Sequence, residues 1–236
     1  MPLARAVRLF SFEEREPESR LASKVWRTRS VPHPAFISVA IPNWELVVTR
    51  QRGRTTMTVR GPETRASTAE IPQNAEFFGI QFELGAFMPS MPLTRLVDDA
   101  ADLPQTSRRS FRLAGSSWEY PTFDNCDVFV DRLVRKGLLV RDPVVVAALR
   151  DDRRDLSPRS LQRHMRRATG LSRTAIRLME RAIRAADLLD NGATIVDVVA
   201  CEGYADQAHL TRSLRRFVGQ TPAQIAMERR SPLAFS

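Results

Sequence analysis

The sequence has few of the residues on which most metal centres and covalent catalytic sites depend. Its 236 residues include three histidines and two cysteines, and Cys126 and Cys201 stand far apart along the chain. Metal sites are built mainly from His, Cys and carboxylate groups at short, recognisable spacings. We therefore expect no metal and no cofactor, and we expect both cysteines to be reduced and buried.

The positions of the histidines exclude a His-rich metal site in the first half of the chain. His164 and His209 lie in the C-terminal third, so only His33 remains, and we interpret it as a loop residue between two prolines. The sequence also lacks a Gly-rich phosphate loop, a nucleophile elbow and a paired-cysteine motif. Acidic pairs such as Glu13-Glu14 and Asp98-Asp99 are interpreted as solvated. The sequence predicts that the protein is not an enzyme.

Long apolar segments are missing as well. No run approaches the roughly 18 residues that a membrane-spanning helix needs. The first twenty residues also lack the apolar core of a signal peptide. We expect a soluble, cytoplasmic protein that makes no contact with a membrane.

Positive charge, by contrast, is abundant and is carried almost entirely by arginine. The chain has 36 Lys and Arg against 27 Asp and Glu, which gives a formal net charge of +9. Seven arginines stand between Arg153 and Arg173 against one acid, Asp155. Many soluble proteins are basic, so this balance favours an anionic partner without identifying it. Cations gathered on one surface would neutralise phosphates and make binding salt-dependent.

Two short stretches of the last third copy each other. Leu161–Gly170 reads LQRHMRRATG and Leu210–Gly219 reads LTRSLRRFVG, with five of ten positions identical at an offset of 49 residues. Such a repeat indicates one supersecondary unit used twice. Each copy predicts a helix with an apolar stripe, from which Arg163 and Arg212 point away. The stripes are Leu161, Met165 and Ala168 in the first copy, and Leu210, Leu214 and Phe217 in the second.

Capping residues around the repeats predict a close series of short helices. Expected N-caps, prolines at the first helical position and glycine stops recur through this region. They are Ser157, Ser172, Thr194, Asp206 and Thr221; Pro158 and Pro222; and Gly170, Gly192, Gly203 and Gly219. The segment Ile195–Glu202, followed by a turn at Gly203 and a helix after Asp206, has the helix-turn-helix pattern. Upstream, Asp142-Pro143 opens an apolar helix that leads into the first copy.

The run GYADQAHLTRSLRRFVGQTPAQI, from Gly203 to Ile225, resembles the signature of the AraC/XylS family of transcription regulators, as does SPRSLQRHMRRATGLS before it. The resemblance covers about 142–227. It implies two helix-turn-helix units, joined by one long helix, that place two recognition helices in successive major grooves. Ser172–Asp190 is similar to that linker, and about 18 residues give a rod of roughly 27 Å. This length is close to the spacing of about 34 Å between successive grooves.

The resemblance also implies which side chains read DNA. The matching positions in the first recognition helix are Arg159, Gln162 and Arg163, and those in the second are Gln207, Ala208, His209 and Arg212. Arg suits guanine and Gln suits adenine, whereas Ala208 reaches at most a thymine methyl group. Arg166, Arg167, Arg215 and Arg216 are expected to contact phosphates or to pack at the helix ends. Tyr204, Leu210 and Pro222 are interpreted as structural, and Asp206 as an N-cap.

The first half of the chain reads as short strands. The runs at 36–41, 44–50, 54–60, 67–71 and 76–84 favour a small barrel or sandwich, with a hairpin turn at Gln51–Gly53. Residues 1–30 are either a loose arm or an edge strand. Residues 93–104 look like one or two helical turns, and Phe123–Val140 reads as an amphipathic helix with Phe129, Leu133 and Leu138 near one side. The aromatic residues either fill the core or line an effector pocket: Trp26, Trp44, Phe77, Phe78, Phe82 and Phe87.

The sequence thus predicts an α+β protein. The resemblance implies that residues 1–140 form a β-rich, cupin-like sensor or dimerisation domain and that residues 141–236 form an all-α double helix-turn-helix domain. We expect a sequence-specific transcription regulator that binds double-stranded DNA. The resemblance adds RNA polymerase, an unidentified small-molecule effector and a second copy of the chain as further partners. Two alternatives stay open, a module that binds RNA or an acidic partner and a nonspecific DNA binder; Gln162 and Gln207 argue against the second, because phosphate binding needs no Gln.

Overall fold

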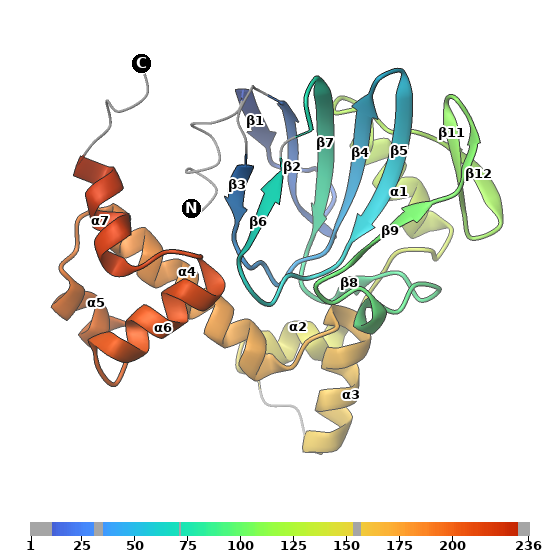
Figure 1. Cartoon of the computed structure of the whole chain (residues 1–236). Coiled ribbons are helices and arrows are strands. Elements are labelled where there is room, and N and C mark those ends of the chain that lie inside the picture. The colour runs from blue at the N-terminus through green and yellow to red at the C-terminus, as the bar shows by residue number, and fades with distance from the viewer. Residues whose placement is uncertain (1–10, 31–34, 71, 153–156, 231–236) are drawn as a thin grey trace.

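The largest element of the computed structural model, which describes residues 11–30, 35–70, 72–152 and 157–230, is an antiparallel six-stranded sheet (Figure 1). Its strands alternate between apolar and polar residues over part of their length, as expected for a sheet with one face in the core. In spatial order the strands are β1 (Ser11–Arg15), β2 (Ala22–Arg29), β7 (Ala75–Phe82), β4 (Glu45–Gln51), β5 (Arg54–Arg60) and β9 (Ala100–Leu103).

The β4–β5 hairpin has the turn that the sequence predicts. Gln51 pairs with Arg54, so Arg52 and Gly53 alone form the turn, with φ of 49° and 75°. Positive φ at both turn residues is the geometry whose twist matches that of the flanking strands. Beyond the turn, Met57 and Val59 are fully buried on one face of the sheet.

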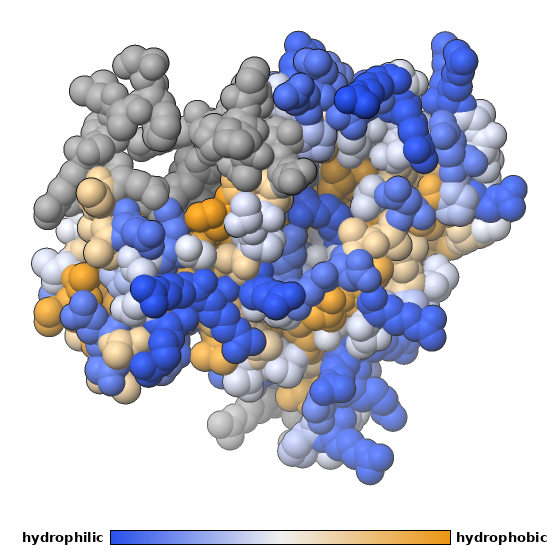
Figure 2. All heavy atoms as spheres, in the orientation of Figure 1, coloured by the Kyte–Doolittle hydropathy of each residue, from blue (hydrophilic) through white to orange (hydrophobic). Residues whose placement is uncertain are grey.

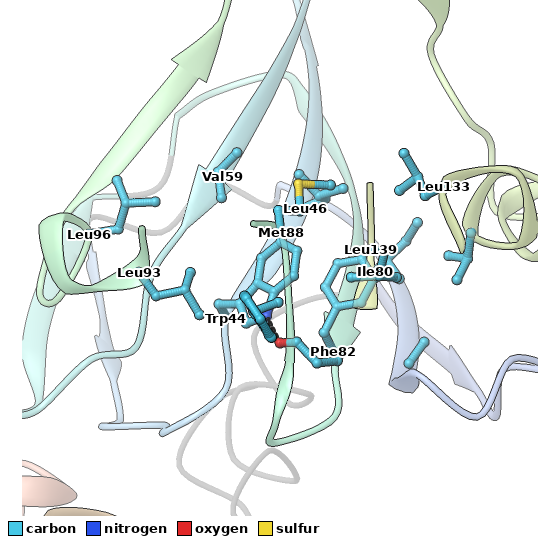
Figure 3. Packing of buried hydrophobic residues seen from close by; sticks show 14 of the residues in the cluster. Trp44, Leu46, Val59, Ile80, Phe82, Met88, Leu93, Leu96, Leu133 and Leu139 are labelled. Carbon is cyan, nitrogen blue, oxygen red and sulfur yellow. Dashed lines mark hydrogen bonds between the residues drawn. The ribbon is translucent and has the colours of Figure 1, made fainter. Parts of the chain in front are cut away.

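Over the described residues, three smaller sheets and two helical segments join the large sheet in the β-rich half. They are β3 (Ala35–Ser38) with β6 (Ser67–Glu70); β8 (Ala86–Phe87) with β13 (Val140–Arg141); β10 (Gln105–Ser107), β11 (Ser110–Leu113) and β12 (Ser116–Glu119); the 3-10 helix η3 (Leu93–Arg95); and α1 (Cys126–Arg135). Figure 3 shows Leu93 of η3 and Leu133 of α1 among the apolar side chains around the large sheet, and all of them belong to one core. At the centre, the Trp44 ring stacks on Phe82 at 4.1 Å, and its indole N–H donates to the Ala86 carbonyl at 2.7 Å.

Several expectations for this half need correction. Of the two alternatives for residues 1–30, the described part has the edge strand, β1, and a second strand, β2, pairs with it; residues 1–10 lie outside the described part. Residues 93–104 hold only one 3-10 turn, because Ala100–Leu103 pairs with β5 and forms the edge strand of the sheet. The helix expected over Phe123–Val140 is limited to α1: Gly137 follows it with φ of 66°, and Val140 then pairs with Phe87. Cys201 is exposed, whereas Cys126 is buried; both are free thiols.

The C-terminal helices follow the predicted caps. Each of the five expected N-caps accepts a backbone N–H, and each expected glycine stop has positive φ. The helices are α2 (Pro143–Leu149), α3 (Pro158–Thr169), α4 (Arg173–Asp190), α5 (Ile195–Cys201), α6 (Gln207–Phe217) and α7 (Pro222–Arg230). In Figure 1, α4 runs between the α2–α3 pair and the α5–α7 group.

Two apolar cores divide these helices in an unexpected way. Met165 and Ala168 of α3 pack into the same core as the large sheet, whereas Leu210 and Leu214 of α6 pack into a second core with α4 and α7. Phe217, at the end of α6, belongs to the first core. The first helix-turn-helix unit is therefore built onto the β-rich half, and the second touches it at one end. The domain boundary expected at residue 140 stays a prediction.

No helix in the described ranges is both long and apolar enough to cross a membrane. Over the same residues, no group of three or more His, Cys, Asp or Glu side chains is arranged to hold a metal ion. His33 and Asp155, which entered the sequence interpretation, lie outside the described residues.

Candidate DNA-reading interface

The expected reading residues of the first unit form one exposed face of α3. The Ser157 hydroxyl accepts the Ser160 N–H at 3.2 Å, and Pro158 supplies the first helical residue. At about 100° per residue, the reading residues span an arc of about 100°. All four are exposed: Arg159, Gln162, Arg163 and Arg166. Met165 and Ala168, which are buried, lie outside that arc.

The second unit presents an equivalent face, which includes one residue that was not among the predicted reading residues. Asp206 caps α6, since its carboxylate accepts the His209 N–H at 2.6 Å. Adding the offset of 49 to the four α3 positions gives Ala208, Thr211, Arg212 and Arg215. Thr211 was not among the predicted reading residues, although the repeat itself could have identified it. Its hydroxyl donates to the Gln207 carbonyl at 2.8 Å and stays partly exposed.

Gln207 and His209 lie at the two edges of this face. Gln207 is exposed, whereas His209 is half-buried with its ring edge-on to Tyr204, 5.2 Å between centroids. Tyr204 is itself buried, and its hydroxyl lies 3.1 Å from that of Ser213. These contacts confirm Tyr204 as a structural residue of the turn. They also give His209 a packing role beside the reading role that the sequence predicts for it.

The arginines of the two reading faces are free of ion pairs within the described part of the chain. Neither α3 nor α6 contains an acidic residue, and all of these side chains are exposed: Arg159, Arg163, Arg166, Arg212 and Arg215. Figure 2 shows strongly hydrophilic side chains gathered over α3 and α6. Both faces are therefore available to an anionic partner.

Three arginines of α4 are paired with acidic side chains. Arg173 and Arg177 both bind Asp151, the latter at 2.5 Å. Their hydrogen bonds and charge hold the pKa of Asp151 below its usual value, the Arg177 hydrogen bond contributing most. Arg184 pairs with Glu202 at 3.2 Å. These pairs offset part of the positive charge of α4, whereas the arginines of the reading faces have no acidic side chain on their own helices.

The last arginine of each copy turns toward an aromatic ring. The Arg167 guanidinium lies 5.2 Å from the Phe87 ring, and that of Arg216 lies 5.0 Å from the ring of Phe217. Both rings belong to the core of the β-rich half. This supports the expected packing role at the helix ends, whereas Arg166 and Arg215 stay exposed and unpaired.

The C-terminal corner of each copy rests against the β-rich half at an equivalent residue. A Cβ atom on Gly170 would lie 3.0 Å from the Leu93 carbonyl oxygen, and one on Gly219 would lie 2.7 Å from Cγ2 of Ile37. At the second corner, the Ala40 N–H donates to the Phe217 carbonyl at 2.8 Å. The Ala66 N–H likewise donates to the Arg216 carbonyl at 2.7 Å. These bonds satisfy two carbonyl groups that the end of α6 leaves without intrahelical partners.

A polar pair ties the first unit to the strand before it. Asp142 caps α2 through Oδ1, and its Oδ2 lies 2.7 Å from Nδ1 of His164 on α3. The Asp142 N–H donates to the Gly85 carbonyl at 2.8 Å. His164 is the repeat partner of Ser213, so the same helix position holds a structural contact in both units.

Comparison with known proteins agrees with this geometry. A family model described as a helix-turn-helix domain matches residues 152–227. Two solved structures of ToxT from Vibrio cholerae also match, and none of the curated proteins does. One is 10% identical, covering 92% of this chain and 98% of that chain with a TM-score of 0.35. The other, from strain O395 and bound to (E)-4-(8-methylnaphthalen-1-yl)but-3-enoic acid, is 9% identical, covering 92% and 99% with a TM-score of 0.36.

The family match spans both exposed reading faces, the linker α4 and the turn at Gly203. It agrees with the resemblance that the repeated sequence shows to the AraC/XylS regulators. Residues 152–227 therefore form a DNA-binding helix-turn-helix domain of the type that the AraC/XylS regulators carry.

Proposed function

We propose that α3 and α6 enter two successive major grooves of one DNA site and read it unequally. The proposal rests on the unpaired arginines of the two equivalent exposed faces. The α3 face carries Arg159, Gln162 and two further arginines, whereas Ala208 and Thr211 occupy the equivalents of the first two positions on α6. Since a bidentate Arg contact favours guanine, the half-site under α3 is expected to hold more fixed guanines than the half-site under α6.

We also propose that the β-rich half gates this reading, acting as the sensor domain over residues 1–140. Two groove segments one turn apart are related by translation along the DNA axis, so two helices inserted alike must run parallel. In Figure 1, α3 and α6 run in different directions. The contacts at Ala40 and Ala66 hold the end of α6 in this arrangement. Release of these contacts, by an effector or by a second copy of the chain, would let the α5–α7 group turn about α4.

Reading is tested with a site selected from random duplexes by the full-length protein. Arg163→Ala and Arg212→Ala are each expected to weaken binding by about 1–3 kcal/mol and to relax the base preference in their own half-site. Arg108→Ala is the matched control, because it removes the same charge from an exposed turn of the β-rich half. Fluorescence anisotropy at fixed salt measures all three. Equal losses for the three variants would leave only a general charge effect and would refute the proposal.

A further inference from the structure

The inner face of the large sheet changes from apolar side chains at one end to charged side chains at the other. Register places Val25, Ile80 and Leu46 side by side in one row, and all three are buried in the core. The next row is Arg27, Phe78 and Val48, and the last row is Arg29, Glu76 and Arg50. Residues two apart along a strand face the same side, so all three rows point inward. The apolar core is therefore bordered at this end of the sheet by a charged opening, the mouth, which is formed by Arg29, Glu76 and Arg50.

A cavity of about 620 Å³ occupies this mouth. Its floor is apolar, because Phe78 and Val48 are 8% and 2% exposed. Pro121 and Phe123 line it from the segment before α1, and the rings of Phe78 and Phe123 meet edge to face at 6.4 Å. A volume of this size is typical of small-molecule sites, which combine apolar walls with a few charged groups.

Most charges around the cavity are already paired. Arg27 binds Glu13 at 2.6 Å and lies over the Phe123 ring at 4.4 Å. Arg29 binds Glu76 at 2.5 Å. Each of these pairs is neutral overall, so neither creates a demand for a charged ligand.

Arg50 and Asp124 are the two charged lining residues without an ion pair among the described residues. Asp124 directly precedes Asn125, the N-cap of α1, and a carboxylate there is stabilised by the helix dipole. Arg50 has no comparable local partner: its neighbours across the sheet are Glu76, which is bound to Arg29, and Thr55. The unmatched charge at the cavity is therefore positive and is fixed on a strand.

We propose that this cavity binds a small aromatic carboxylate, with its ring on the apolar floor beside the Phe78–Phe123 pair and its carboxylate on the Arg50 guanidinium. Aromatic rings pack favourably edge to face, and a guanidinium binds a carboxylate through paired hydrogen bonds. The inference deepens the proposed function and rests on it for the consequence of binding. Arg29 ends β2, and β3, the next strand along the chain, carries Ile37, the neighbour of Gly219 at the end of α6.

The test measures binding to the full-length protein by calorimetry, without DNA. The probes are benzoate, 3-phenylpropanoate and 4-phenylbenzoate, each beside its neutral amide and its amine analogue. We expect at least one acid to bind and its amide and amine to bind at least about 10-fold more weakly. Arg50→Gln should weaken binding of the acid by about 10-fold or more, since it removes the charge-assisted hydrogen bond. Arg54→Gln, an exposed arginine of the same hairpin outside the cavity, should leave binding unchanged.

Several outcomes would overturn the inference: no acid binding at millimolar concentration, an amine that binds better than its acid, or equal effects of the two Arg variants. Thermal unfolding of both variants checks that they are folded. DNA binding is measured separately on the same preparations. A protein that binds the acid but no specific DNA site would refute the proposed function and leave the cavity assignment standing; the reverse result would refute the cavity assignment alone.

Discussion

Replacing Gly219 by alanine tests the contact between α6 and the β-rich half. The new Cβ atom would lie 2.7 Å from Cγ2 of Ile37 and 3.2 Å from Cβ of Ala66, closer than van der Waals contact allows. Gly219 also has φ of 79°, which costs an alanine about 1–2 kcal/mol. That cost arises whether or not α6 is docked, because it belongs to the turn itself. Only the steric overlap acts on the docking equilibrium.

The size of this effect follows from the neighbour that must move. Overpacking a well-packed site costs about 1–3 kcal/mol, and Ile37 is 43% exposed, so its side chain can yield and the lower end applies. If the docked arrangement cannot place both helices in DNA, the apparent dissociation constant is raised by the reciprocal of the undocked fraction. A loss of about 1 kcal/mol from docking should therefore tighten binding to the bipartite site about fivefold.

Gly203→Ala provides the matched control. Gly203 ends α5 with φ of 66°, so alanine suffers similar backbone strain there, but no atom lies within 4 Å of its added Cβ. The two variants are compared by fluorescence anisotropy on the selected site, and their stability is compared by urea unfolding. Tighter binding by Gly219→Ala alone supports gating. If Gly219→Ala binds no more tightly than Gly203→Ala, docking does not restrain DNA reading and the gating proposal fails.

Two further predictions concern the outer face of the large sheet. Burial raises the pKa of Glu45, although Arg60 and the hydrogen bond from Trp26 oppose this shift. The folded state therefore favours the protonated carboxyl. The stability that this carboxyl contributes is complete below its usual pKa and is lost as pH rises through the raised pKa. Glu45→Gln should therefore gain stability relative to the wild type as pH rises above the ordinary Glu pKa of about 4.3; a pH-independent difference in urea unfolding would contradict this. Gly79→Ala should destabilise by about 2–4 kcal/mol, because its Cβ would lie 2.1 Å from the Trp26 ring, whose N–H donates to Glu45 at 3.0 Å. A double-mutant cycle with Trp26→Leu should remove most of that cost, and additive losses would refute the clash.

The C-terminal helices could be predicted because their signals are local. A cap such as Ser157 and a stop such as Gly170 lie within a few residues of the helix end that they define. Strand β9 could not be predicted in this way, since Ala100–Leu103 depends on pairing with β5, about forty residues earlier. Its alternation is short and weak, and a helical turn was an equally good interpretation. Local signals therefore suffice where a structure satisfies its own hydrogen bonds, and fail where a distant strand supplies them.

The same distinction between local and distant signals applies to the candidate site. Arg163 and Arg212 followed from helical periodicity, because exposure on an amphipathic helix depends on position alone. The half-burial of His209 depends on where the turn places Tyr204, which no periodicity encodes. The docking of α6 on the β-rich half could not be predicted from the sequence, for a different reason. Its donors are the backbone N–H groups of Ala40 and Ala66. Because every residue except proline has such a group, the residue type does not indicate this contact.

Two copies of one unit differ in mobility once they pack on different partners. The α3 unit shares the core of the β-rich half through Met165 and Ala168, so moving it would expose apolar area from the main core. The α6 unit keeps a core of its own with α4 and α7, and its release would expose mainly Phe217 and Val39, which packs against that second core. Free energies of local opening are lowest where the least apolar contact is lost. We therefore expect the second unit to move more readily than the first, as the proposed gating by the β-rich half requires.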